Sequence, residues 1–169
     1  MSEVHKKYMQ LAIKEAEKAL VDGVLPVGAI VVGDGKVVGR GRRRAGDHPY
    51  LDHAEIGAMR EALQTASNST EGPMLTLYST LEPCLMCFAT ALNTRRIGNI
   101  IYAVEDPYGG GTSLPQSVLT PRYKEWYPKA QGGVMREEVI KLLRKFFMAT
   151  NDPYWANPEN PLRKLAENR

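Results

Sequence analysis

Two short clusters of metal-binding residue types place the strongest constraint on how this chain can fold. The first is His53-Ala54-Glu55, and the second is Pro83-Cys84-Leu85-Met86-Cys87. Each cluster stands where the apolar pattern predicts the start of a helix. Because the clusters are far apart in sequence, their side chains can meet only if the two helices pack side by side on one sheet.

The clusters together supply one imidazole, two thiolates and one carboxylate. His53, Cys84 and Cys87 are the candidate ligands of a Zn²⁺ ion, since one nitrogen and two sulfur ligands suit this metal. Three protein ligands leave a fourth tetrahedral position open for water, which is typical of catalytic zinc sites. Glu55 is not needed as a ligand, and it is the candidate group that takes a proton from that water and passes it on.

Helix starts suit such ligands, because their unpaired N–H groups and partial positive charge favour the thiolate forms of Cys84 and Cys87. Taken separately, the clusters have other interpretations. A lone His-x-Glu is more often an ordinary helix start, and a lone Cys-x-x-Cys is a redox dithiol or half of a structural zinc site. The redox interpretation gives His53 and Glu55 no task. The structural one lacks a fourth ligand, since His5 and His48 lie elsewhere.

The apolar pattern predicts strands and helices in alternation. The first half predicts a helix over 4–21 and strands over 27–32 and 36–39, which the turn Gly33-Asp34-Gly35 joins. A loop over 40–52 follows, and then a helix to residue 63, which Asp52 and Glu55 begin as a capping box. Residues 67–73 are predicted to form a polar loop. The second half reads as a strand over 75–78, a helix to residue 93 with Pro83 in its first turn, a strand over 99–104, an irregular segment over 106–131, a fifth strand at Val134 and a helix over 137–148. This order predicts an α/β sandwich whose sheet is mixed, because it opens with a hairpin.

Composition limits the class of protein. A length of 169 residues, 43% of them hydrophobic, suffices for one domain with its own core. The net charge of +3 is no proof of a nucleic-acid partner. Two cysteines one helical turn apart do not make a disulfide framework, and no apolar run approaches the roughly 20 residues that cross a membrane. We therefore expect a cytoplasmic protein with no membrane partner.

Four segments resemble the cytidine deaminase superfamily, in the branch that holds tRNA adenosine deaminases, yeast-type cytosine deaminase and bacterial guanine deaminases. They are 25–32, 53–56, 80–87 and 96–102, and the pair Phe146-Phe147 at a helix end also matches. His-x-Glu followed by Pro-Cys-x-x-Cys is the signature of zinc deaminases that act on cytosine and adenine. The resemblance implies a three-layer α/β/α sandwich around a mixed five-stranded sheet, and a homodimer with active sites near the interface.

The implied activity is hydrolytic. A zinc-dependent deaminase converts an amino group on a nucleobase, nucleoside or related heterocycle to a carbonyl and releases ammonia. We expect residues 1–150 to form this domain and residues 151–169 to form a C-terminal extension that packs on or near the active site. There, Tyr154 and Trp155 are either packing anchors or side chains that close the pocket.

The resemblance also implies roles for single residues. Glu55 is the expected catalytic residue. The backbone N–H groups of Ala54 and Cys84 would bind the substrate carbonyl or the attacking oxygen, and the Glu82 carbonyl would face the departing amine. Two residues of similar segments complete the expected substrate contacts: Val27, and Asp106 at the start of a loop that is similar to that of the tRNA enzymes.

One position departs from the branch. Where its members usually carry an asparagine that reads the ring or ribose, just after the second strand, this chain has Arg43. Its neighbours Arg40, Arg42 and Arg44 make this segment either a solvated loop or a clamp for a substrate phosphate or an RNA backbone.

Three functions follow from these observations. The first is deamination of a small nucleobase, nucleoside or related heterocycle, and the second is adenosine-to-inosine deamination of tRNA. The third is a non-catalytic RNA-binding or partner subunit with the same fold. Glu55 argues against the third, because such a subunit does not need a group that moves protons.

Overall fold

A mixed five-stranded sheet forms the centre of the protein. We analysed a computed structural model, which describes residues 2–48, 50–65 and 74–167. The spatial order of the strands is β2 (Lys36–Arg42), β1 (Gly28–Gly33), β3 (Leu75–Leu81), β4 (Ile97–Val104) and β5 (Lys129–Gln131). β1 is antiparallel to both of its neighbours, whereas β3, β4 and β5 are parallel. The expected polar loop at 67–73 lies outside the described residues.

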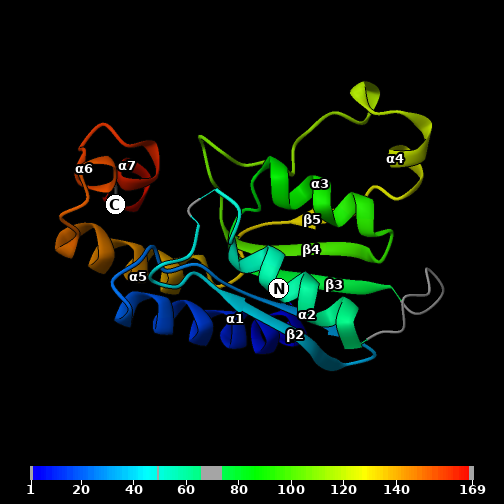
Figure 1. Ribbon diagram of the computed structural model, residues 1–169, viewed down its shortest axis with the longest axis horizontal. Helices are drawn as coiled ribbons and strands as arrows, with labels where there is room; N and C mark the ends of the chain where they lie inside the picture. The colour runs from blue at the N-terminus through cyan, green and yellow to red at the C-terminus, as the bar shows by residue number, and fades with distance from the viewer. Residues whose placement is uncertain (1, 49, 66–73, 168–169) are drawn as a thin grey trace.

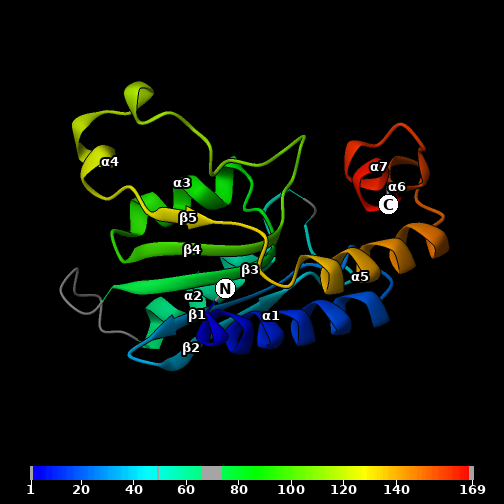
Figure 2. The same cartoon turned by 180° about the vertical axis from the view of Figure 1, so that it is seen from behind.

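Helices cover both faces of the sheet and make three layers. α2 (Ala54–Thr65) and α3 (Leu85–Thr94) lie on one face (Figure 1). α1 (Glu3–Val21) and α5 (Arg136–Ala149) lie on the other (Figure 2). The short elements are η1 (Gln116–Val118), α4 (Pro121–Glu125), α6 (Pro153–Ala156) and α7 (Pro161–Glu167). This architecture confirms the predicted α/β/α sandwich. Among the described residues, no helix has the length and apolar character that crossing a membrane requires.

The buried strand β1 and the glycines of β2 bring the first cluster against the sheet. Every residue of β1 is buried, since helices pack on both of its sides. A side chain at Gly41 in β2 would overlap the backbone carbonyl of Ala54. The missing side chain therefore lets the start of α2, and with it His53, lie directly on the strand.

Two strand predictions were wrong. β2 continues to Arg42, so Arg40 and Arg42 belong to a strand and not to a loop over 40–52. The fifth strand is Lys129–Gln131 and not a strand at Val134. Val134 is fully buried and its N–H donates to the Tyr102 carbonyl at 3.2 Å, but it follows the strand. The residues of β5 are all exposed, so this short edge strand has no apolar alternation that would reveal it.

Both predicted helix starts also shift. The Asp52 carboxylate accepts a hydrogen bond from the His48 N–H at 2.9 Å and makes no capping box, because α2 begins two residues later at Ala54. Pro83 precedes α3, whose N-cap is Cys84. The extended backbone of Cys84 places this ligand at the mouth of the helix, while Cys87 lies one turn inside it.

Candidate active site

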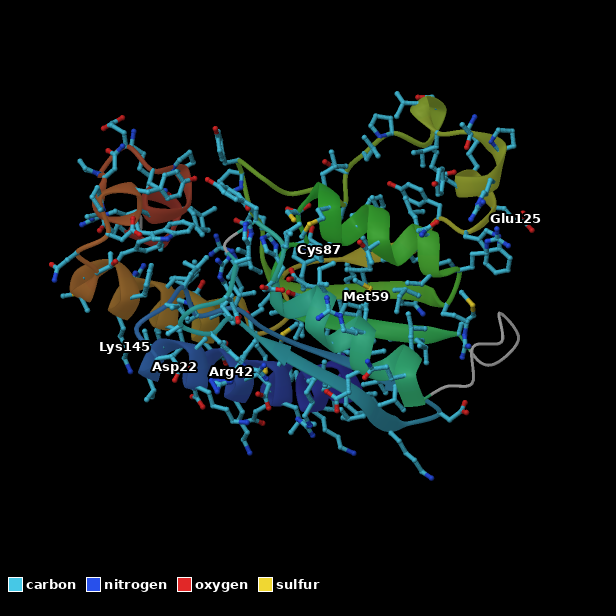
Figure 3. The ribbon with its side chains drawn as sticks, viewed as in Figure 1. Asp22, Arg42, Met59, Cys87, Glu125 and Lys145 are labelled. Atoms are coloured by element: carbon cyan, nitrogen blue, oxygen red, sulfur yellow. The ribbon has the colours of Figure 1, made fainter. Side chains whose placement is uncertain are left out.

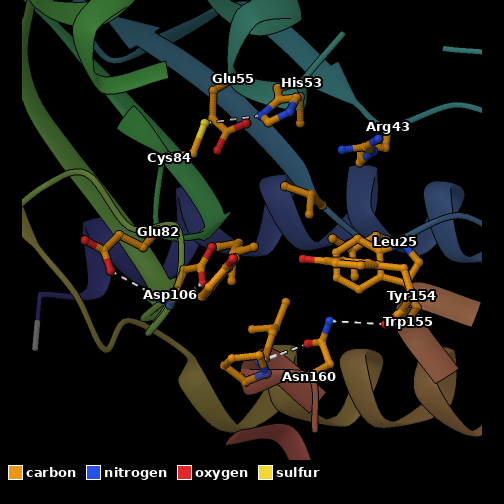
Figure 4. A pocket seen from close by; sticks show the side chains of 16 residues that line it. Leu25, Arg43, His53, Glu55, Glu82, Cys84, Asp106, Tyr154, Trp155 and Asn160 are labelled. Atoms are coloured by element: carbon orange, nitrogen blue, oxygen red, sulfur yellow. Dashed lines mark hydrogen bonds between the residues drawn. The ribbon is translucent and has the colours of Figure 1, made fainter. Parts of the chain in front are cut away.

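The three candidate ligands meet between the starts of α2 and α3. The Nδ1 atom of His53 lies 3.5 Å from the sulfur of Cys84 and 3.5 Å from that of Cys87, and the two sulfurs are 3.7 Å apart. Glu55 lies beside them without being part of this group (Figure 4). Packing of α2 against α3 on one sheet therefore joins the two sequence clusters.

These distances fit a zinc ion. Around tetrahedral zinc, Zn–S bonds of about 2.3 Å and Zn–N bonds of about 2.0 Å place two sulfurs about 3.8 Å apart and a sulfur about 3.5 Å from a nitrogen. The ligand atoms of His53, Cys84 and Cys87 already have this spacing. The donor set of one imidazole and two thiols is also one that zinc prefers, so these residues fit the ion.

The protons of the three ligands are coupled. The sulfurs of Cys84 and Cys87 share a hydrogen bond at 3.7 Å, and this contact lowers the pKa of Cys84 to about 4. The same contact raises the pKa of Cys87. The hydrogen bond to Cys84 raises the pKa of His53. Cys84 is therefore a thiolate at neutral pH, which is the form that binds metal ions.

Glu55 is buried next to the ligands. Its side chain accepts a hydrogen bond from the Ser79 hydroxyl at 3.3 Å. Burial raises the pKa of the Glu55 carboxyl. A buried carboxyl beside the metal ligands is suited to take up a proton and release it again.

His53 and Cys84 open onto a cavity of about 640 Å³, a volume that includes open solvent at its mouth. All of the expected substrate contacts line it, namely Val27, Arg43, Ala54, Glu82, Cys84 and Asp106. His53 and Glu55 line it as well. Residues that the sequence argument did not assign to the pocket also take part: Leu25, Leu81, Tyr108, Asn160, Pro161 and Leu162.

The C-terminal segment forms the wall opposite the metal ligands (Figure 4). Trp155 packs against the rings of Phe146 and Phe147, with ring centroids 6.1 Å and 6.3 Å apart. Asn160 caps α7, since its side-chain oxygen accepts from the Leu162 N–H at 3.1 Å. The sequence does carry a signal for this helix, because asparagine followed by proline is typical of a helix start.

The four arginines do not form one clamp. The Arg42 guanidinium pairs with Asp22 at 2.7 Å beside α1, away from Cys87 (Figure 3). Arg40 lies 3.7 Å from Glu15, also in α1. Of the four, only Arg43 lines the pocket, and its N–H donates to the Val27 carbonyl at 3.2 Å.

Comparison with known proteins identifies the family. Residues 2–104 match the cytidine and deoxycytidylate deaminase zinc-binding region. The tRNA-specific adenosine deaminase of Streptococcus pyogenes serotype M18 is 35% identical over 146 residues, which cover 83% of this chain and 87% of that protein. The tRNA(Ile)-lysidine synthase of Deinococcus radiodurans is 38% identical over 160 residues, but this chain spans only 26% of its length.

A solved structure agrees with these sequence matches. It comes from studies of A-to-I editing by tRNA:A34 deaminases at the wobble position of transfer RNA. Its TM-score is 0.67 at 30% identity, and the match covers 80% of this chain and 98% of that one. The resemblance of the four segments is thereby confirmed, together with the zinc-binding character of the site. The chain belongs to the cytidine and deoxycytidylate deaminase family, and it is a zinc-dependent deaminase.

Proposed function

We propose that this enzyme deaminates a free nucleobase, a nucleoside or a related small amino-heterocycle. The observation that carries the proposal is the wall that α6 and α7 add to the pocket. Tyr154, Trp155 and Asn160 face the cavity from the side opposite His53 and Cys84. A cavity bounded on both sides suits a small ring, whereas the loop of a folded RNA needs an open approach to the metal.

The proposed reaction exchanges an exocyclic amine and a water molecule for a carbonyl and ammonia. His53, Cys84 and Cys87 would hold Zn²⁺, which when bound would lower the pKa of a water molecule to about 7. Glu55 would take one proton from the attacking water and deliver it to a ring nitrogen, and would then take the second proton of that water and deliver it to the leaving amine. The N–H groups of Ala54 and Cys84 stand at helix starts, where backbone donors lack partners within the helix, and are the proposed donors to a substrate oxygen.

Adenosine-to-inosine deamination of tRNA is the second candidate. It is favoured by the 35% identity to a tRNA-specific adenosine deaminase over most of both chains. The proposed Arg43 contact argues against a shared mode of substrate recognition, because an arginine replaces the neutral side chain that reads the ring or ribose in that branch. The homodimer that the resemblance implies stays a prediction.

A substrate panel separates the two candidates. Ammonia release is measured with the zinc-loaded enzyme on free bases, nucleosides, nucleotides and anticodon stem-loops. The proposal predicts turnover of at least one free base, nucleoside or nucleotide and none of the stem-loops. Turnover confined to a stem-loop would establish the tRNA function instead.

Arg43→Asn is expected to raise KM for the native substrate. A guanidinium at the pocket favours a substrate that carries a phosphate, a carboxylate or a strongly accepting ring atom. The asparagine amide in this variant should in turn lower KM for a neutral nucleobase or for adenosine. KM across the substrate panel measures both changes. Arg42→Asn is the matched control, since Arg42 pairs with Asp22 outside the pocket. Unchanged constants for Arg43→Asn on every substrate would remove Arg43 from substrate recognition.

We further propose that residues 1–150 form the deaminase domain and that residues 151–169 serve it as a wall of the active site. Trp155→Ala should then raise KM several-fold with zinc retained, because Trp155 both lines the pocket and anchors α6 on α5. Trp126→Ala is the control, since Trp126 is the C-cap residue that follows α4 and is not among the pocket residues. A wild-type KM in folded Trp155→Ala protein would contradict this role.

A further inference from the structure

The side chain of Glu82 has no part in the mechanism described so far, although it is buried two residues from the ligand Cys84. Its carboxylate accepts three hydrogen bonds. The Thr112 hydroxyl donates at 2.5 Å, the Thr112 N–H at 3.2 Å and the Asp106 N–H at 3.1 Å. Figure 4 shows the Glu82 carboxylate turned to Asp106, away from His53 and Glu55. The side chain therefore joins two ends of one loop.

That loop, residues 106–112, lies on the backbone of the metal ligand. Gly110 pairs with Cys84 in an isolated antiparallel bridge, and the Gly111 N–H donates to the Pro83 carbonyl at 2.9 Å. A side chain at Gly110 would overlap the Glu82 carboxylate, so the carboxylate fills the space that this glycine leaves.

The same loop forms part of the pocket wall. Asp106 and Tyr108 both line the cavity. The Asp106 carboxylate accepts from the N–H groups of Tyr108 and Gly109, each at 3.0 Å, which holds the turn in shape. Glu82 thus fixes the ends of the loop, while Asp106 fixes its turn. Together they set where this wall stands relative to Cys84.

We propose that the Glu82 side chain is a positioning residue of the deaminase. It neither binds the metal nor moves the proton. It acts through Thr112 and the Asp106 N–H to hold the wall at residues 106–108 against the metal site. The inference rests on the proposed function only in using deamination as one readout, because the hydrogen bonds that carry it do not depend on the substrate.

Glu82→Gln tests the proposal while keeping the size of the side chain. An amide has one acceptor oxygen, so it cannot accept from both Thr112 and the Asp106 N–H. We expect kcat/KM to fall about 10- to 100-fold, as for other residues that orient a metal site from outside it. The loss should lie more in KM than in kcat, because the wall faces the substrate and not the proton path. Zinc content should stay at one ion per chain, and the backbone amides of residue 106 and residues 108–112 should exchange with solvent faster.

Thr112 variants show whether Glu82 acts through this residue. Thr112→Val removes the hydroxyl and should raise KM in the same direction, whereas Thr112→Ser should restore it. The double variant Glu82→Gln/Thr112→Val should lose no more than Glu82→Gln alone, because the two residues share one interaction. Thr90→Val is the matched control, since its hydroxyl bonds the Met86 carbonyl within α3, outside the pocket lining.

Several outcomes would overturn the proposal. They are wild-type kinetic constants in zinc-loaded Glu82→Gln, additive losses in the double variant, no rescue by Thr112→Ser, or an equal loss in Thr90→Val. If Glu82→Gln does not fold, the kinetic constants of Thr112→Val, Thr112→Ser and the control Thr90→Val still test the proposal. Absence of turnover in the wild-type enzyme would instead count against the proposed substrate class, and the exchange of the backbone amides of residue 106 and residues 108–112 would still test Glu82.

Discussion

Glu55→Gln is expected to abolish nearly all deamination while the fold and the zinc content stay as they are. Glutamine has the shape of glutamate and can still accept from the Ser79 hydroxyl, but it cannot take up a proton. Groups that act in general acid–base catalysis typically contribute about 100- to 10,000-fold, and one that acts at several steps should reach the upper end or exceed it. The rate of ammonia release on the true substrate measures the loss.

The variant should not be unstable, which separates its effect from misfolding. Burial raises the pKa of Glu55 because it disfavours the charged form, so a neutral amide meets no added cost there. Glu61→Gln is the matched control, since Glu61 lies on the exposed side of the same helix. Retention of more than about a tenth of the wild-type rate would refute the assignment of Glu55 as the group that moves the proton.

The metal site was predictable because its spacing is local. Cys84 and Cys87 are one helical turn apart, and this alone brings two sulfurs together. The alternation of strands and helices then supplied the remaining step, since it places two helices side by side on one sheet. The sandwich and the convergence of His53 on the cysteines both follow from that pattern.

Which arginines face α1 could be predicted only by knowing the residue at which β2 ends. In an extended strand, side chains alternate between the two faces. Arg40 and Arg42 therefore point to the same side, toward α1, and Gly39 and Gly41 lie against α2. A strand that was predicted to stop at residue 39 could not show this.

The pocket walls depended on contacts between distant segments. The docking of Trp155 on Phe146 and Phe147 determines where the C-terminal segment lies, and no local pattern records that contact. In the same way, Glu82 sits beside the cysteine motif, but its sequence position does not tell whether the carboxylate faces the metal or Thr112. Such roles are set by the path of a loop that returns from far along the chain.

Cys87→Ala is expected to lose the zinc and, with it, part of the stability of the enzyme. Cys87 is fully buried. Its sulfur lies 3.7 Å from the Cys84 sulfur and 3.5 Å from Nδ1 of His53, as expected for atoms that bind the same zinc ion. With only two ligands left, zinc occupancy should fall to less than about a tenth of one ion per chain, because the binding free energy of the metal depends on the complete set. Elemental analysis of the purified variant measures the occupancy.

The thermal midpoint separates loss of the metal from loss of packing. Any ligand that binds only the folded state raises its stability, so added zinc should raise Tm of the metal-stripped wild-type enzyme. The same addition should leave Tm of Cys87→Ala unchanged. The cavity that alanine creates should lower Tm below that of the metal-stripped wild type by only a few degrees, since about 1 kcal/mol corresponds to about 2–4 °C in a chain of this size. Full zinc occupancy in Cys87→Ala would show that the ligand assignment is wrong, whereas low occupancy with an unresponsive Tm would tie the metal to this cysteine.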